Sequence, residues 1–488
     1  MSKRPNIIFM QCDSMDGRAM DPMGLAALKG VTPAMSSMAQ EGTLFENTYC
    51  TNPVCCCSRS SMWSGQYTFN CHAWNNYKGL PKNQPNFKTE LEKNGYTAGV
   101  FGKTDIISGQ HSIRARVTAW TRSAKIDRPQ YNMEVPHVAD TYEKRVHASD
   151  WKNLDIAIDW LNGAAKNEEP FFMYLGVNAP HPRFHTSKYY MDRIDMDAIE
   201  IPPEDEYSHP VMEYQRKAKA WTHGLDADTK RFVRAIYYAM IAETDEMLGT
   251  LLTEIEKLGI GDDTYIVFTG DHGECGLEHD LFYKMNMYEP AMRVPLLING
   301  PDVKKGQRVS RMTSLVDIFP TLMSMAGVDS VVKQDGNSLI SELRGEKSAL
   351  ANVAFGEFHD GPVSTGTSMV RKDNWKYITF VGDEPLLFDL ENDPWEVKNL
   401  APEMPEKAAE MDALMRSIVD YEAIDRLVKE YDRDSFRVWR QEQIAQGTYR
   451  DNMALVYSGF DKIAPENIMP WTDEEEQIII DWLEEYPV

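Results

Sequence analysis

The chain has 488 residues and a formal net charge of −24, and 42% of its residues are hydrophobic. This acidic balance argues against nucleic acid as the main partner, because phosphate backbones attract basic surfaces. No segment approaches the roughly 20 consecutive apolar residues that a membrane-spanning helix needs, so we expect no membrane partner. The first residues lack the long apolar segment of a secretion signal, which favours a cytoplasmic protein.

Short apolar runs typical of buried strands alternate with amphipathic segments over the larger part of the chain. The runs fall at residues 6–10, 98–101, 171–176, 265–269 and 295–298, and resemble the strands of a parallel sheet. Residues 153–161 and 230–258 have the spacing of helices. This alternation predicts an α/β fold with a large, mostly parallel sheet flanked by helices. Ligands bind such sheets where the strands end and the loops begin.

A change in composition near residue 350 predicts a second, smaller domain. Residues 353–358, 375–380 and 386–390 have the pattern of antiparallel strands, and residues 403–445 are helical and strongly charged. We therefore expect an α/β domain over 1–350 and an antiparallel α+β domain with a helical tail over 351–488. The tail after Phe436 is too apolar to be free, so we expect it to pack on the core or on a neighbouring subunit of a homo-oligomer.

The cysteines are unusual in their distribution. There are seven, and three are consecutive at positions 55–57. An odd number at irregular spacing argues against a disulfide framework. A zinc site would need a second cysteine or histidine pair, and the sequence does not complete one. Three adjacent cysteines are also poorly suited to ordinary packing, which points to a chemical use.

The most specific motif is Cys55-Cys56-Cys57-Ser58-Arg59, followed shortly by Ser64-Gly65. It resembles the Cys-x-Pro/Ala-Ser-Arg signature of the type I sulfatases, a family of the alkaline-phosphatase superfamily. The resemblance implies the α/β fold of the alkaline-phosphatase superfamily. It also implies that Cys55 is oxidised to formylglycine, whose hydrate attacks sulfur and later expels sulfate, and that Arg59 holds the hydrate. A helix beginning just after Cys55 would direct its positive end at the anion.

One position departs from that signature. Cys57 stands where proline or alanine is usual. The resemblance places this residue in the recognition site of a formylglycine-generating maturation enzyme, which would be a partner of the chain. The departure bears on whether Cys55 is matured and leaves the predicted fold unchanged.

Candidate metal ligands follow two of the predicted strands. Asp13 comes after the run 6–10, and Asp271-His272 follows the run 265–269, so both lie where a site would form. Two carboxylates and an oxygen of modified Cys55 suit one hard divalent cation, which we expect to be calcium, while the His272 nitrogen also admits manganese. Magnesium is a further alternative. Many sulfatases have a second aspartate beside the first, and here that residue is Ser14.

The resemblance also implies cationic groups for the bound anion. Lys103 follows the run 98–101, His181 follows the run 171–176, and Lys284 lies shortly after the metal pair. We expect all three to bind sulfate and act in catalysis, with His181 protonating the leaving oxygen. His209 is a weaker candidate for the histidine role.

Two further roles stay open at the level of sequence. Many sulfatases have a histidine where Asp105 stands, so the base that triggers sulfate release is either Asp105 or His111. Asn76 is a candidate for holding a substrate oxygen.

The resemblance extends along nearly the whole chain. Residues 13–18, 74–80, 102–105, 282–289 and 480–483 are similar to the glucuronate-2-sulfatase branch of the family. This implies a small anionic sulfate ester as substrate, either a 2-O-sulfated uronic acid or an aryl sulfate. Lys78 or Arg116 would then meet the uronate carboxylate. The alternatives are a phosphonate monoester or phosphodiester hydrolase of the same superfamily, and an inactive anion-binding homologue whose Cys55 is never oxidised.

Overall fold

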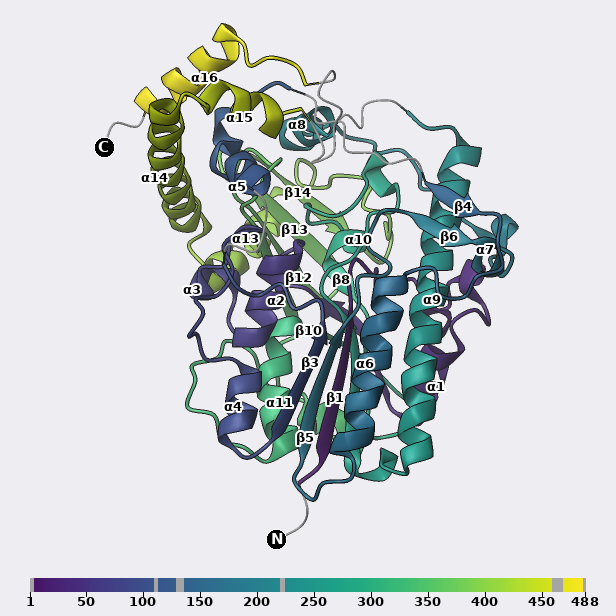
Figure 1. Ribbon diagram of the computed structural model, residues 1–488. Coiled ribbons are helices and arrows are strands. Elements are labelled where there is room, and N and C mark those ends of the chain that lie inside the picture. Colours follow the sequence, from purple (N-terminus) through teal and green to yellow (C-terminus); the bar gives the residue numbers. More distant parts are fainter. Residues whose placement is uncertain (1–3, 109–112, 129–135, 220–223, 459–467, 486–488) are drawn as a thin grey trace.

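A computed structural model describes residues 4–108, 113–128, 136–219, 224–458 and 468–485. It contains an eight-stranded sheet with helices on both faces and a separate four-stranded sheet beside it (Figure 1). A two-stranded sheet of β4 (His137–Ala139) and β6 (His185–Ser187) lies near the loop that follows β5. The large mixed sheet and the smaller antiparallel sheet confirm the predicted fold class.

The large sheet has the strand order β10-β2-β9-β7-β1-β5-β3, with the short β8 paired to β2. The adjacent strands β7, β1, β5 and β3, with β3 at the edge of the sheet, are parallel, as predicted. The strands are β1 (Asn6–Cys12), β2 (Thr43–Tyr49), β3 (Thr97–Gly102), β5 (Phe171–Gly176), β7 (Thr264–Gly270), β8 (Arg293–Val294), β9 (Leu296–Asn299) and β10 (Gln307–Ser314).

One strand runs against the prediction. Residues 295–298 were expected to form a parallel strand, but β9 is antiparallel to both β2 and β7. The chain reaches β8 and β9 from loops at the carboxyl edge of the sheet, so it must travel back down the sheet. β8 and β9 are a single segment along β2, interrupted at Pro295, which has no backbone N–H to donate.

Helices cover both faces of the large sheet. α1, α6 and α9 lie on one face, and α2, α4 and α11 on the other (Figure 1). The predicted helices at 153–161 and 230–258 are α6 and α9. α9 begins where the Asp226 side chain accepts a hydrogen bond from the Thr229 N–H, and it ends at Gly259 in a left-handed conformation. The helices of this part are α1 (Pro33–Glu41), α2 (Cys55–Ser64), α3 (Thr68–Cys71), α4 (Phe87–Lys93), α5 (Ile113–Trp120), α6 (Ala148–Ala164), α7 (Lys188–Met191), α8 (Pro210–Ala218), α9 (Ala227–Leu258), α10 (Glu289–Met292), α11 (Ile318–Ala326) and α12 (Ile340–Leu343).

A cluster of aromatic rings fixes α2 against the sheet. The rings of Trp63 on α2 and Phe87 on α4 have centroids 4.3 Å apart, and Trp63 meets Tyr174 of β5 at 5.0 Å. Tyr174 stacks in turn on Phe9 of β1 at 5.6 Å. These large buried rings determine where the first residue of α2 lies relative to the end of β1.

The smaller sheet is formed by β11 (Val353–Phe358), β12 (Thr367–Lys372), β13 (Trp375–Phe380) and β14 (Asp383–Asp389), all antiparallel. Its side chains alternate between two cores. Phe358, Met369 and Phe388 join the core of the large sheet. Val370, Leu387 and their neighbours pack on α13 (Pro405–Ile418). Since one core spans both sheets, the domain boundary near residue 350 stays a prediction.

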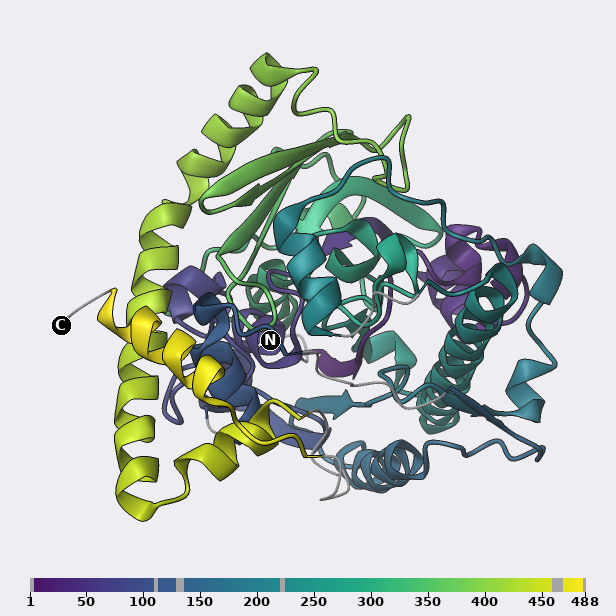
Figure 2. The same ribbon diagram turned by 90° about the horizontal axis from the view of Figure 1, so that it is seen from above.

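The tail packs against the chain itself. α14 (Tyr421–Gln446), α15 (Tyr449–Val456) and α16 (Asp473–Glu484) enclose an apolar cluster with α5, and the tail lies along one side of the molecule when it is seen from above (Figure 2). Trp439, Trp471 and Trp482 are buried in this cluster. This confirms the expectation that the segment after Phe436 packs on the core. Among the described residues, no helix is long and apolar enough to cross a membrane.

Candidate active site

The four predicted metal ligands meet at the carboxyl edge of the large sheet. Asp13 follows β1 and Asp271-His272 follows β7, and the pairing of Cys12 with Gly270 brings these ends together. One ligand atom each from Asp13, Cys55, Asp271 and His272 lies within 4.8 Å of the others. Cys55 Sγ is 3.2 Å from His272 Nε2 and 3.7 Å from Asp13 Oδ1. All four residues are buried.

Hydrogen bonds to backbone groups orient these ligands. His272 Nδ1 lies 2.9 Å from the carbonyl oxygen of Gly273, which makes Nδ1 the N–H donor and directs the Nε2 lone pair at the cluster. Asp271 Oδ1 accepts hydrogen bonds from the N–H groups of Ser14 and His272. Two buried carboxylates and one unprotonated imidazole nitrogen within a few ångströms form a donor set that fits one divalent cation.

The Arg59 guanidinium contacts the carboxylates of both Asp13 and Asp271. Its Nε donates to Asp271 Oδ2 at 2.7 Å, and Nη2 lies 3.4 Å from Asp13 Oδ2. Nη1 donates to the hydroxyl of Tyr174 and to the carbonyl of Lys103. The guanidinium is fully buried and positions both carboxylates. Tyr174 was not predicted as a site residue, because only its place inside an apolar run was visible in the sequence.

Cys55 is the first residue of α2, so its side chain lies at the positive end of the helix. Burial and the neighbouring Asp13 would raise the pKa of the Cys55 thiol. The charges of Lys103 and Lys284 lead the influences that outweigh both, and that pKa lies well below its usual value. The neighbouring lysines therefore stabilise negative charge at position 55.

The three predicted anion-binding groups surround Cys55. Lys103 Nζ lies 2.5 Å from Asp13 Oδ2. Lys284 Nζ lies 2.7 Å from His181 Nε2, and His181 Nδ1 faces the carbonyl of Pro182. Burial would raise the pKa of Asp13, but Lys103 and His181 contribute to keeping it well below its usual value, so this carboxylate stays charged.

The remaining candidates lie at different distances from this centre. Asn76 Oδ1 accepts a hydrogen bond from the Cys56 N–H, which places it at the start of α2. Asp105 Oδ2 lies 3.8 Å from Lys103 Nζ. His111 falls outside the described residues. His209 caps α8 by accepting from the Val211 N–H at Nδ1, and its Nε2 donates to the Glu384 carbonyl. Its ring lies 4.0 Å from that of Phe380, so His209 is not brought to the site.

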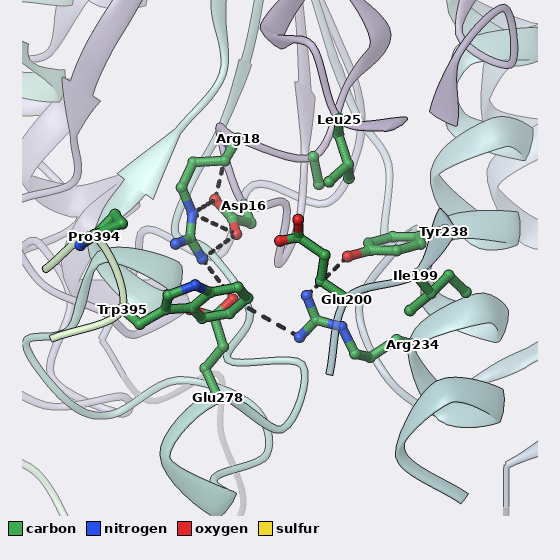
Figure 3. A pocket seen from close by; sticks show the side chains of 11 residues that line it. Asp16, Arg18, Leu25, Ile199, Glu200, Arg234, Tyr238, Glu278, Pro394 and Trp395 are labelled. Atoms are coloured by element: carbon green, nitrogen blue, oxygen red, sulfur yellow. Dashed lines mark hydrogen bonds and ion pairs between the residues drawn. The ribbon is translucent and has the colours of Figure 1, made fainter. Parts of the chain in front are cut away.

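A neighbouring cavity of about 230 Å³ borders the loop that carries Asp13, and it contains none of the four ligands (Figure 3). In it, Arg18 pairs with Asp16 at 2.7 Å and with Glu278 at 2.8 Å. Arg234 of α9 lies 3.7 Å from Glu278. These ion pairs tie the loop after β1 to the loop after β7, and thus support the metal ligands on both loops (Figure 3).

Comparison with known proteins agrees with this geometry. Residues 5–328 match the sulfatase family model. The chain belongs to the sulfatase family. Residues 277–422 also match the model described as N-sulphoglucosamine sulphohydrolase, C-terminal. The sulfatase is 39% identical to arylsulfatase K of Bos taurus over 464 residues, covering 90% of this chain and 86% of that protein. It is 38% identical to arylsulfatase K of Homo sapiens, covering 90% and 87%. The protein is thus a sulfuric ester hydrolase.

Solved structures share the fold. A phosphonate monoester hydrolase of Agrobacterium radiobacter superimposes with a TM-score of 0.71 at 24% identity, covering 85% of this chain and 95% of that one. A 2-O GAG sulfatase gives a TM-score of 0.68 at 22% identity, covering 89% and 94%. At these identities the likeness shows a shared fold.

Proposed function

We propose that this sulfatase hydrolyses sulfate monoesters with a hydrated formylglycine derived from Cys55 and one divalent cation, most simply calcium. The observation that carries the proposal is the meeting of Asp13, Asp271, His272 and Cys55 within 4.8 Å, at the start of α2. Lys103 and Lys284 add positive charge beside Cys55, where a tetrahedral anion would lie.

Asp13, Asp271 and His272 would hold the cation, which when bound supplies positive charge to the nucleophile and the sulfate oxygens. Residue 55, once oxidised and hydrated, would supply one hydroxyl for attack on sulfur, which breaks the S–O bond to the leaving alcohol. Deprotonation of its second hydroxyl would then release sulfate and restore the aldehyde. Lys103 and Lys284 bind sulfate oxygens and orient the ester. His181, in its protonated form, donates a proton to the leaving oxygen from Nε2. Asp105 or His111 takes the proton that starts sulfate release.

The natural substrate we propose is a 2-O-sulfated uronic acid, with aryl sulfates as simpler substrates. Support comes from the 38–39% identity to arylsulfatase K over 90% of the chain. The fold of a 2-O GAG sulfatase is compatible with the same assignment. Small aryl sulfates need less help from His181, because a good leaving group departs without protonation.

A phosphonate monoester or phosphodiester hydrolase is the second candidate. Ser14 in place of a second aspartate and the TM-scores of 0.71 and 0.72 to two phosphonate monoester hydrolases favour it. Sulfate and phosphate esters are both tetrahedral, so the same lysines would serve either substrate. Sequence identity to the arylsulfatase K proteins weighs against this candidate.

Burial of the cysteine motif constrains maturation. Cys55, Cys57 and Arg59 are at most 3% exposed, so a formylglycine-generating enzyme would have to reach them before the chain folds. We propose that oxidation precedes folding, and that an unoxidised chain is an inactive anion-binding protein. All seven cysteines are free thiols, which is compatible with a cytoplasmic location.

The experiment compares kcat/KM for a 2-O-sulfated glucuronide, an aryl sulfate and an aryl phosphodiester, on protein whose Cys55 oxidation has been quantified. The proposal predicts that both sulfate esters exceed the phosphodiester and that the glucuronide exceeds the aryl sulfate. Preference for the phosphodiester would replace the proposed reaction by the second candidate. Preference for the aryl sulfate would keep the reaction and remove the uronate assignment.

A further inference from the structure

A small cavity with an unusual charge lies between η3 (Arg122–Ala124), the end of α8 and the loop after β11. Its volume is about 30 Å³. The lining contributes the cationic side chains of Arg122, Arg128 and Lys219, and its described residues include no carboxylate. We call it the Lys219 cavity. Grouped cations without a lining carboxylate are the chemistry of an anion site.

Arg122 has unused hydrogen-bond donors in this cavity. Its side chain is fully buried, and its Nε donates to Asp432 Oδ2 at 3.3 Å. Within the part of the chain that the structure describes, Nη1 and Nη2 have no hydrogen-bond partner. A buried donor without a partner is costly, so this arrangement favours an anion that accepts from it. Arg128, in contrast, is held by Glu475 and two backbone carbonyls.

The carboxylates near Arg122 neutralise it only in part. Burial raises the pKa of Asp432 to about 8, and the charge of Arg122 acts against that rise. Asp425 lies 3.5 Å from Arg122 Nη2 and also pairs with Lys429 at 2.7 Å. Asp425 is therefore shared between two cations, and Asp360 is a third carboxylate near enough for Arg122 and Lys219 to act on its pKa.

Lys219 adds a second cation that lacks a fixed partner. No hydrogen bond or ion pair of its ammonium is found among the described residues 4–108, 113–128, 136–219, 224–458 and 468–485. Burial and the charge of Arg114 lower the pKa of Lys219 to about 8. The negative charge of Asp360 raises this pKa, but by less. A lysine in this setting gains from a bound anion, because the anion restores its charged state.

Charge and a chain of hydrogen bonds beside the lining relate the Lys219 cavity to the catalytic centre, since Asp360 precedes the lining residue Gly361. Lys284, the lysine beside His181, is close enough for its charge to lower the pKa of Lys219. Asp360 Oδ2 accepts a hydrogen bond from the Asn76 N–H at 2.7 Å, and Asn76 Oδ1 accepts from the Cys56 N–H at 3.1 Å. The cavity and the start of α2 are therefore joined through Asn76.

We propose that Lys219 and Arg122 form a carboxylate subsite, which binds the acid group of the substrate while its sulfate faces Cys55. The inference rests on the proposed sulfate ester hydrolysis and adds the residues that select an acidic sugar. A volume of about 30 Å³ holds roughly two water molecules, which suits a carboxylate and excludes a sugar ring. Lys78, expected from the sequence to meet the carboxylate, instead donates to the His72 carbonyl and lies over the Trp74 ring.

The first test measures kcat/KM for a 2-O-sulfated glucuronide and for its methyl ester, which lacks the charge. Lys219→Met should lower the ratio of the two values by about 10- to 100-fold, as for the loss of a charged hydrogen bond. Lys219→Arg should restore most of this ratio, since arginine keeps the positive charge. Lys217→Met is the control, because Lys217 lies two residues earlier, in the last turn of α8, but pairs with Asp127 at an exposed position. An unchanged ratio in Lys219→Met would overturn the proposal.

The second test separates the subsite from the reaction. In a Cys55→Ser background, which removes the nucleophile precursor, the affinity for the 2-O-sulfated glucuronide is measured by calorimetry with and without Lys219→Met. The subsite predicts affinity weaker by about tenfold or more in the double variant. Equal affinities would refute the subsite even if sulfate esters are hydrolysed. Weaker affinity in a protein that hydrolyses no sulfate ester would keep the subsite and refute the proposed reaction.

Discussion

The Lys284 ammonium lies 2.7 Å from Nε2 of His181, so these two side chains fix each other's positions near Cys55. Because Nδ1 of His181 faces the Pro182 carbonyl, Nε2 is the nitrogen that accepts from Lys284. To act as the proposed acid, His181 has to gain a proton at this nitrogen, and Lys284 then turns from it to the bound sulfate. The pair therefore couples sulfate binding to the proposed acid catalysis.

Replacing His181 should affect slow leaving groups most. We expect His181→Gln to lower kcat/KM for a 2-O-sulfated glucuronide by about 100-fold or more, since general acid catalysis typically contributes 10²–10⁴-fold. For an aryl sulfate with a good leaving group the loss should be much smaller. His137→Gln, at an exposed position in β4, is the control. Equal losses for the two esters would contradict the assigned role.

Removing a metal ligand should remove metal and activity together. We expect Asp271→Asn to lose the bound divalent cation and to lower activity by more than about 100-fold. Unfolding should also become easier by about 3–5 kcal/mol, because buried Arg59 loses its closest carboxylate. Metal content by elemental analysis and thermal unfolding are the measurements.

Asp263→Asn is the matched control for that variant, because Asp263 is exposed at the opposite end of β7. It should keep full metal content and activity. Stoichiometric metal in a folded Asp271→Asn protein would show that the assigned ligand set is wrong.

The preference for an acidic sugar should depend on pH. Lys219 has a pKa of about 8, so it is charged at pH 7 and loses its proton as the pH rises through 8. The kcat/KM ratio of glucuronide to methyl ester should fall about tenfold toward pH 9, and Lys219→Arg should abolish that fall. The charged or titratable groups around Lys219 are Arg114, Arg122, Arg128, Tyr214, Tyr457, Lys284 and Asp360. The same fall in Lys219→Arg would assign the titration to another group.

Restoring the usual residue at position 57 should improve maturation. Cys57 lies in the first turn of α2, where proline is tolerated because its missing N–H has no partner within the helix. We expect Cys57→Pro to raise the fraction of formylglycine at residue 55, measured by peptide mass spectrometry after co-expression with a maturation enzyme. Cys56→Ala should leave that fraction unchanged. Equal fractions in Cys57→Pro and the parent would refute a maturation role for position 57.

Much of the site was visible in the sequence because local patterns determine it. β1 and β7 are apolar runs that end at Asp13 and Asp271, so parallel pairing alone brings these residues together. β2 and β10 were not predicted from the sequence. For β10 (Gln307–Ser314) the reason is its place at a sheet edge, where exposed polar side chains interrupt the apolar run that marks a buried strand.

Other features depend on contacts far apart in the chain. Asn76 caps α2 and meets Asp360, which lies 284 residues further along. The Lys219 cavity likewise joins η3, α8 and the loop after β11, and no local motif indicates that these segments meet. Sequence patterns predict residues at strand ends well, whereas packing between distant loops decides the surroundings of the substrate.

The central claim is that residue 55 is the nucleophile in its oxidised form. The most direct measurement determines, for preparations with different degrees of maturation, the formylglycine fraction at residue 55 and the rate of sulfate release from an aryl sulfate. We predict that the rate is proportional to the fraction and falls to background when Cys55 is unmodified. Full activity in protein whose Cys55 is entirely unmodified would contradict the mechanism.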